Sequence, residues 1–145
     1  MSKTENRKEQ ILFLIWAQSL VAMLGSLFFS EIMGFVPCEL CWYQRILMYP
    51  LVVIYGYALI KKDINLGFPG FILSGIGIFV SGYHYLIQKL PMLSENGASC
   101  GIVPCNVEYI NYLGFITIPF LALTAFIVIF SFHSMLLIQQ RRRDQ

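Results

Sequence analysis

Four long apolar stretches constrain the fold of this chain more than any other feature. They cover residues 11–30, 42–60, 68–88 and 112–138 of the 145 residues. A helix needs about 20 mostly apolar residues to cross the roughly 30 Å hydrocarbon core of a bilayer, and lipid offers no partners for unpaired backbone groups. With 57% hydrophobic and 12% charged residues, little chain is left for a separate soluble domain. The sequence therefore predicts an all-α integral membrane four-helix bundle, a single domain over residues 1–145.

The positions of the cations predict the orientation of the helices. Eight of the ten Lys and Arg residues lie before the first stretch, between the second and third, or after the fourth: Lys3, Arg7, Lys8, Lys61, Lys62, Arg141, Arg142 and Arg143. By the positive-inside rule this side is the cytoplasm. We therefore expect both termini inside and two connections outside, in a multi-pass protein of the cell membrane. The terminal arginines indicate topology and not a nucleic-acid-binding tail, and the first stretch, lacking a cleavage site, is expected to be a retained, structural anchor.

All four cysteines fall in the two expected exterior connections. Cys38 and Cys41 belong to the first, and Cys100 and Cys105 to the second. Disulfides persist in oxidising compartments outside the cytoplasm. The distribution therefore favours thiol–disulfide chemistry over cytosolic metal handling.

The first cysteine pair is a C-x-x-C motif at the start of the second stretch. Pro37 suits the first turn of a helix, so we expect the helix to begin beside Cys38. Spacings of three and four residues then place Cys38, Cys41 and Arg45 on one face. The unpaired amides of the first turn, the helix dipole and the guanidinium all favour thiolate over thiol. A structural disulfide or half of a zinc site would use the same two cysteines.

Small residues form a stripe along the third stretch, at spacings of four, three and four: Gly70, Ser74, Gly77 and Ser81. Such stripes let transmembrane helices approach closely, so this face is predicted to look into the bundle. The same spacing reaches His84, which we expect to face inward at a depth similar to that of Arg45, roughly 6 Å below the outer boundary. An interfacial or structural histidine is the alternative for His84, and His133 is predicted to be interfacial.

Cys100 and Cys105 enclose Gly-Ile-Val-Pro in the longest connection, which we expect to be mobile. A disulfide closing so small a ring is of the exchanging kind when it is strained or exposed. A structural staple is the alternative.

Taken together, these features resemble the DsbB family of quinone-dependent membrane thiol oxidoreductases, in the compact BdbC-like form of Gram-positive bacteria. The resemblance rests on the four spans, on Cys38-Glu-Leu-Cys41 followed by Trp-Tyr-Gln-Arg45, on Tyr83-His84-Tyr85, on the Cys100 and Cys105 pair, and on Leu113-Gly114. It implies an enzyme that reoxidises a soluble or membrane-anchored thioredoxin-fold thiol oxidase (DsbA- or BdbD-like) outside the membrane. The electrons would pass to a membrane quinone, menaquinone or ubiquinone.

The resemblance also implies roles for single residues. Cys100 would form the mixed disulfide with the partner, Cys105 would exchange with Cys38, and Cys41 would face the quinone. Arg45 would hold the quinone carbonyl and stabilise negative charge, with His84 a weaker candidate for the quinone site and no metal site expected. The second connection is much shorter here than in enterobacterial members.

Three other classes of protein share some of these features. A metal-binding membrane protein could use the four thiolates as a Cys₄ site, although Arg45 would then have no task. A non-enzymatic bundle could use both pairs as structural disulfides. A vitamin K epoxide reductase-like enzyme would perform similar chemistry, but there the helix-borne C-x-x-C follows the loop pair in the chain.

Overall fold

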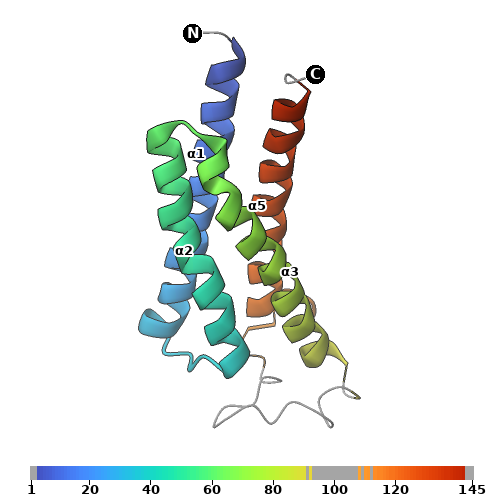
Figure 1. Ribbon diagram of the computed structural model, residues 1–145. Helices are drawn as coiled ribbons and strands as arrows, with labels where there is room; N and C mark the ends of the chain where they lie inside the picture. Colours follow the sequence, from blue (N-terminus) through green and yellow to red (C-terminus); the bar gives the residue numbers. More distant parts are fainter. Residues whose placement is uncertain (1–2, 91, 93–107, 109, 112, 143–145) are drawn as a thin grey trace.

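The protein is described by a computed structural model that covers residues 3–90, 92, 108, 110–111 and 113–142. Four long helices run alternately in opposite directions (Figure 1): α1 Lys3–Leu27, α2 Glu39–Lys61, α3 Phe68–Lys89 and α5 Ile118–Arg141. The start of α1 and the end of α5 lie at one end of the bundle, together with the connection between α2 and α3, which contains the short helix η2 Ile64–Gly67. The connection between α1 and α2 lies at the opposite end.

The four helices form a ring in which α1 packs on α2, α2 on α3, α3 on α5 and α5 on α1, whereas α2 and α5 meet at few positions. Each is long and apolar enough to cross a membrane. Large apolar side chains point away from the bundle, and Val53, Ile60 and Phe79 are 74%, 78% and 79% exposed. Such faces are suited to lipid and not to water. The predicted all-α multi-pass membrane fold is confirmed.

The start of α2 was predicted closely. The helix begins at Glu39 and Cys38 is its N-cap residue, so the expectation that it begins beside Cys38 is confirmed. Pro37, however, precedes the cap and does not lie in the first turn. Its fixed φ still limits how the connection enters the helix.

The start of α5 differs from the sequence prediction. The helix begins at Ile118, later than the expected start of the stretch 112–138. Leu113 and Gly114 both have a positive φ, of 57° and 81°, which is incompatible with a right-handed helix. Pro119 then occupies the first turn, where its missing N–H is not needed.

The small-residue stripe of α3 faces the bundle as predicted, and Gly70, Ser74, Gly77 and Ser81 are all buried. A Cβ atom added at Gly70 would lie 2.7 Å from the Tyr55 ring of α2, and one added at Gly77 would lie 2.5 Å from the Phe126 ring of α5. The missing side chains are therefore what allow α3 to approach both neighbours.

His133 corrects a sequence-based expectation. It was predicted to be interfacial but is fully buried, with Nδ1 3.1 Å from Tyr55 Oη and its ring 5.1 Å from that of Phe71. The position lies on the inward face of α5 that also carries Phe126 and Ile129. A histidine near a helix end can thus be a packed, hydrogen-bonded residue of the bundle.

We expect Gly77→Ala to lower the thermal unfolding midpoint of the detergent-solubilised protein, because the added methyl group meets the Phe126 ring. Overpacking of this kind costs about 1–3 kcal/mol. Gly82→Ala on the same helix is the matched control, since nothing lies within 4 Å of its added Cβ. Equal midpoints for the two variants would contradict the packing argument.

Candidate functional site

The first turn of α2 holds two thiols in contact. Cys38 Sγ donates a hydrogen bond to Cys41 Sγ at 3.1 Å, and the two cysteines are in the reduced thiol form. Cys38 is buried, with 6% of its surface exposed, while Cys41 is half-buried. The i, i+3 spacing of the motif thus places the pair within reach of a disulfide bond, as the sequence predicted.

His84 of α3 lies against this pair. It is buried, as predicted, with Nε2 3.6 Å from Cys38 Sγ and Nδ1 2.9 Å from Gln44 Nε2. With the amide donating to Nδ1, the imidazole carries its proton on Nε2 and presents it to the Cys38 sulfur. The histidine therefore orients and polarises Cys38.

Gln44 is a site residue that the sequence analysis did not single out. It is 5% exposed and its amide holds the His84 ring. The signal was present, since Gln44 lies three residues after Cys41 and so shares its helix face. A glutamine within an apolar stretch is a candidate for such a contact, because its amide needs partners.

The surroundings of Cys38 raise the pKa of its thiol. The hydrogen bond with Cys41, and next the burial of the side chain, raise the pKa of the Cys38 thiol to about 12, while the contact with His84 acts in the opposite direction. The expectation that this end of the helix favours a thiolate is therefore wrong for Cys38 in the reduced pair. A thiol proton directed at Cys41 Sγ stabilises negative charge on Cys41 instead.

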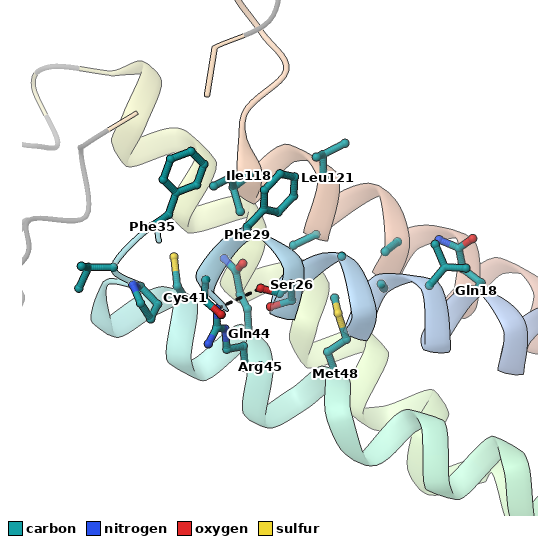
Figure 2. A pocket seen from close by; sticks show the side chains of 18 residues that line it. Gln18, Ser26, Phe29, Phe35, Cys41, Gln44, Arg45, Met48, Ile118 and Leu121 are labelled. Carbon is teal, nitrogen blue, oxygen red and sulfur yellow. Dashed lines mark hydrogen bonds between the residues drawn. The ribbon is translucent and has the colours of Figure 1, made fainter. Parts of the chain in front are cut away.

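A cavity of about 280 Å³ opens beside Cys41, between α1, α2 and α5 (Figure 2). Most of its lining is apolar, and the polar side chains are few, as is typical of small-molecule sites. The lining residues are Gln18, Val21, Ala22, Gly25, Ser26, Phe29, Ser30, Phe35, Val36, Pro37, Cys41, Gln44, Arg45, Met48, Ile118, Leu121, Ala122 and Ala125. Its volume is near the lower end of the usual range of about 300–1,000 Å³.

Arg45 lines this cavity together with Cys41. Its Nη2 donates to the Ser26 carbonyl oxygen at 3.2 Å (Figure 2), and its guanidinium lies 5.5 Å from the centre of the Trp42 ring. A guanidinium has five N–H donors, and the bond to Ser26 is made by one of its two Nη groups. The structure thus brings Arg45 and Cys41 to one cavity, as the spacing of four residues predicted, whereas His84 is not among the lining residues.

The wall contributed by α1 was not predicted. The first stretch was expected to be structural, but Gln18, Ser26 and Phe29 line the cavity. At this point α1 passes into a short π-helix, η1 Phe28–Ile32. Short π-helical segments of this kind are frequent at functional sites.

The other two cysteines predicted to be catalytic are not among the residues that the structure describes. Cys100 and Cys105 lie outside the described residues. The described ends of their connection meet at Lys89, whose Nζ lies 2.9 Å from both Glu108 Oε1 and the Gly114 carbonyl oxygen. These ends lie at the same end of the bundle as the start of α2.

Comparison with known proteins agrees with this geometry. The family model "Disulfide bond formation protein DsbB" matches residues 8–137. The chain belongs to the DsbB family. It is a multi-pass membrane thiol–disulfide oxidoreductase that serves disulfide bond formation.

Relatives of this DsbB-family protein match it over nearly their whole lengths. It is 57% identical to a probable disulfide formation protein of Oceanobacillus iheyensis over 144 residues, 99% of each chain. It is 53% identical to disulfide bond formation protein C of Bacillus subtilis over 131 residues, 89% of this chain and 95% of that one. An SPbeta prophage-derived disulfide bond formation protein B of Bacillus subtilis is 40% identical over 132 residues, 91% of this chain and 88% of the relative. No solved structure matches the chain significantly.

The hydrogen bond between the two thiols predicts a pH effect. In protein with Cys100 and Cys105 replaced by Ser, we expect Cys41→Ala to lower the pKa of Cys38, because the largest cause that raises it is removed while the His84 contact remains. The midpoint of Cys38 alkylation by iodoacetamide, followed by mass spectrometry across pH, should then move to lower pH. Adding His84→Ala should move it back upward. A midpoint unchanged by Cys41→Ala would contradict the assignment.

Proposed function

We propose that this protein accepts electrons from a soluble or membrane-anchored thioredoxin-fold thiol oxidase outside the membrane and passes them to a membrane quinone in the cavity beside Cys41. The observation that carries the proposal is that a redox-competent sulfur and a cation, Cys41 and Arg45, line the same apolar cavity. Neither a structural disulfide nor a Cys₄ site accounts for that arrangement.

The cavity suits a quinone ring. A quinone is an apolar ring with carbonyl acceptors on its edge, and the lining combines apolar side chains with the N–H donors of Arg45. The half-buried Cys41 provides the sulfur at the cavity wall. When bound, the quinone supplies an acceptor for two electrons and two protons, so that a dithiol becomes a disulfide and the quinone becomes a quinol.

The residues around the pair control its charge. Cys38 keeps its proton and directs it at Cys41, so that negative charge is favoured on the sulfur that lines the cavity. Arg45 stabilises negative charge on the cavity side, because a fixed cation in a low-dielectric setting acts strongly. His84 and Gln44 hold Cys38 from the side of α3.

Thiol exchange would bring the electrons to this site. By likeness to the family, the partner's thiolate attacks Cys100 of a Cys100–Cys105 disulfide, forming a mixed disulfide and releasing Cys105, and Cys105 then exchanges with Cys38 of a Cys38–Cys41 disulfide. Each exchange breaks one disulfide for each one formed, so two electrons move with no net change in sulfur bonds until the acceptor is reduced. The asymmetric placement of cations supports an extracytoplasmic position for both pairs.

Arg45 provides the sharpest test of the quinone site. We expect Arg45→Ala to raise the KM for quinone by about 10- to 100-fold, because a charge-assisted hydrogen bond contributes roughly 1.5–3 kcal/mol. Arg45→Lys should also raise KM, by a smaller factor, since an ammonium lacks the planar fork. Steady-state quinone reduction measures both effects, while single-turnover thiol exchange with the partner should stay near normal. Quinone kinetics unchanged in Arg45→Ala would remove this residue from the site.

Gly25→Leu tests the same cavity without altering its charge. Gly25 lines the cavity and has open space around an added Cβ, so the side chain should occupy volume that the quinone needs and raise its KM. Gly82→Leu, also in open space but not among the lining residues, is the matched control. Equal KM values for the two leucine variants would show that the quinone binds elsewhere.

The order of thiol exchange has a separate test. Cys105→Ser should trap a mixed disulfide between Cys100 and an oxidised thioredoxin-fold oxidase, because the Cys100 thiolate opens the oxidase disulfide, releasing one oxidase thiol, and no second loop thiol is left to resolve the adduct. The adduct should form when the partner is added outside intact spheroplasts, and peptide mass spectrometry identifies the linked cysteine. An adduct through Cys38 or Cys41, or one that requires permeabilisation, would overturn the proposed path or orientation.

A further inference from the structure

Cys38, Cys41 and His84 form a cluster with the chemistry of a metal site. Their two sulfurs and one imidazole nitrogen all lie within 4.8 Å of one another. We propose that the reduced form of this site captures a thiophilic divalent cation of the Zn²⁺ class and is thereby held in the dithiolate form. The proposal uses the same dithiol as the proposed function but does not depend on the quinone or the partner.

The distances suit tetrahedral ligation. Zinc binds sulfur at about 2.3 Å and imidazole nitrogen at about 2.0–2.1 Å. In a tetrahedral site the ligand atoms then lie about 3.6 Å apart for sulfur and nitrogen, and about 3.8 Å apart for two sulfurs. Cys38 Sγ and His84 Nε2 are 3.6 Å apart, and the two sulfurs are 3.1 Å apart. To bind the metal, the two sulfurs would have to move apart from 3.1 Å to about 3.8 Å.

The ligand types and their support also suit this class of metal. Two thiolates and an imidazole select zinc and similar soft or borderline ions over magnesium or calcium. A ligating histidine normally has its second nitrogen held by another group, and Gln44 lies 2.9 Å from Nδ1 of His84. Turning the glutamine amide end for end would let its oxygen accept from Nδ1–H and leave the Nε2 lone pair for the metal.

The site can balance the charge of the metal and can admit a fourth ligand. Binding releases two protons, because M²⁺ and two thiols give a neutral dithiolate complex and 2 H⁺. Cys41 lines the cavity, so a water molecule can complete the coordination from that side. Arg45, the cation nearest along the helix, is bonded to the Ser26 carbonyl of α1.

The redox state of the pair would control this site. A disulfide has no thiolate to offer, so the metal can bind only after the C-x-x-C pair has been reduced. Ligation engages a lone pair of each sulfur, so attack on a disulfide and oxidation are both slowed. A thiophilic ion would therefore slow turnover by holding the enzyme in its reduced state.

Cadmium is a suitable probe, because cadmium thiolates absorb in the ultraviolet. We would titrate Cd²⁺ into detergent-solubilised protein carrying Cys100→Ser and Cys105→Ser, reduced and then freed of reductant, with Zn²⁺ as competitor. The expected result is one Cd²⁺ per chain, displaced by Zn²⁺, and no such absorption after the pair has been oxidised. His84→Gln should weaken binding at least tenfold, by analogy with the 10- to 100-fold losses seen when supporting groups are removed.

His133→Gln is the matched control, since His133 is the other of the two histidines and contacts Tyr55 instead of the cysteines. Gln44→Leu retains all three ligands and should weaken binding by about tenfold if the amide orients His84.

Size-exclusion profiles verify that each variant is folded. The proposal would be overturned by equal Cd²⁺ affinity in His84→Gln and in the parent protein with Cys100→Ser and Cys105→Ser. It would also be overturned by one Cd²⁺ per two chains, or by the same titration in the oxidised protein. Because the titration uses neither quinone nor partner, its failure would leave the proposed function standing.

Discussion

The close approach of α3 to its neighbours is the contact on which the rest of the structure depends. Gly70 lies against the Tyr55 ring of α2 and Gly77 against the Phe126 ring of α5, where any side chain would collide. Two turns beyond Gly77, the same face carries His84 to the start of α2. The packing that closes the bundle therefore also sets the distance between the imidazole and the Cys38 sulfur.

The C-x-x-C pair has different surroundings on its two sides. Toward α3, Cys38 meets His84, which is held by Gln44. Toward α1 and α5, Cys41 and Arg45 line an apolar cavity. Gln44 takes part in both, because it lines the cavity and also bonds the histidine. The arrangement places the sulfur with the raised pKa against α3 and the other sulfur at the wall of the cavity.

Much of this architecture could be predicted because it follows from local periodicity. Apolar length predicted the four helices, the spacing of small residues predicted the inward face of α3, and the same spacing extended to His84. The later start of α5 depends on a left-handed turn at Leu113 and Gly114, which hydropathy does not register. His133 was misplaced for a related reason, since nearness to a helix end says little about which face a residue occupies.

The sequence by itself determined that the chain crosses a membrane four times and that Cys38, Cys41 and Arg45 share a helix face. Both results come from constraints within a segment: lipid leaves the backbone no partner outside its own helix, and helical spacing sets which side chains are neighbours. Only the tertiary structure decided that α1 and α5 complete the cavity, that Gln44 orients His84, and that contacts and burial raise the pKa of Cys38. These depend on burial and on contacts between side chains far apart in the chain, which no local pattern encodes.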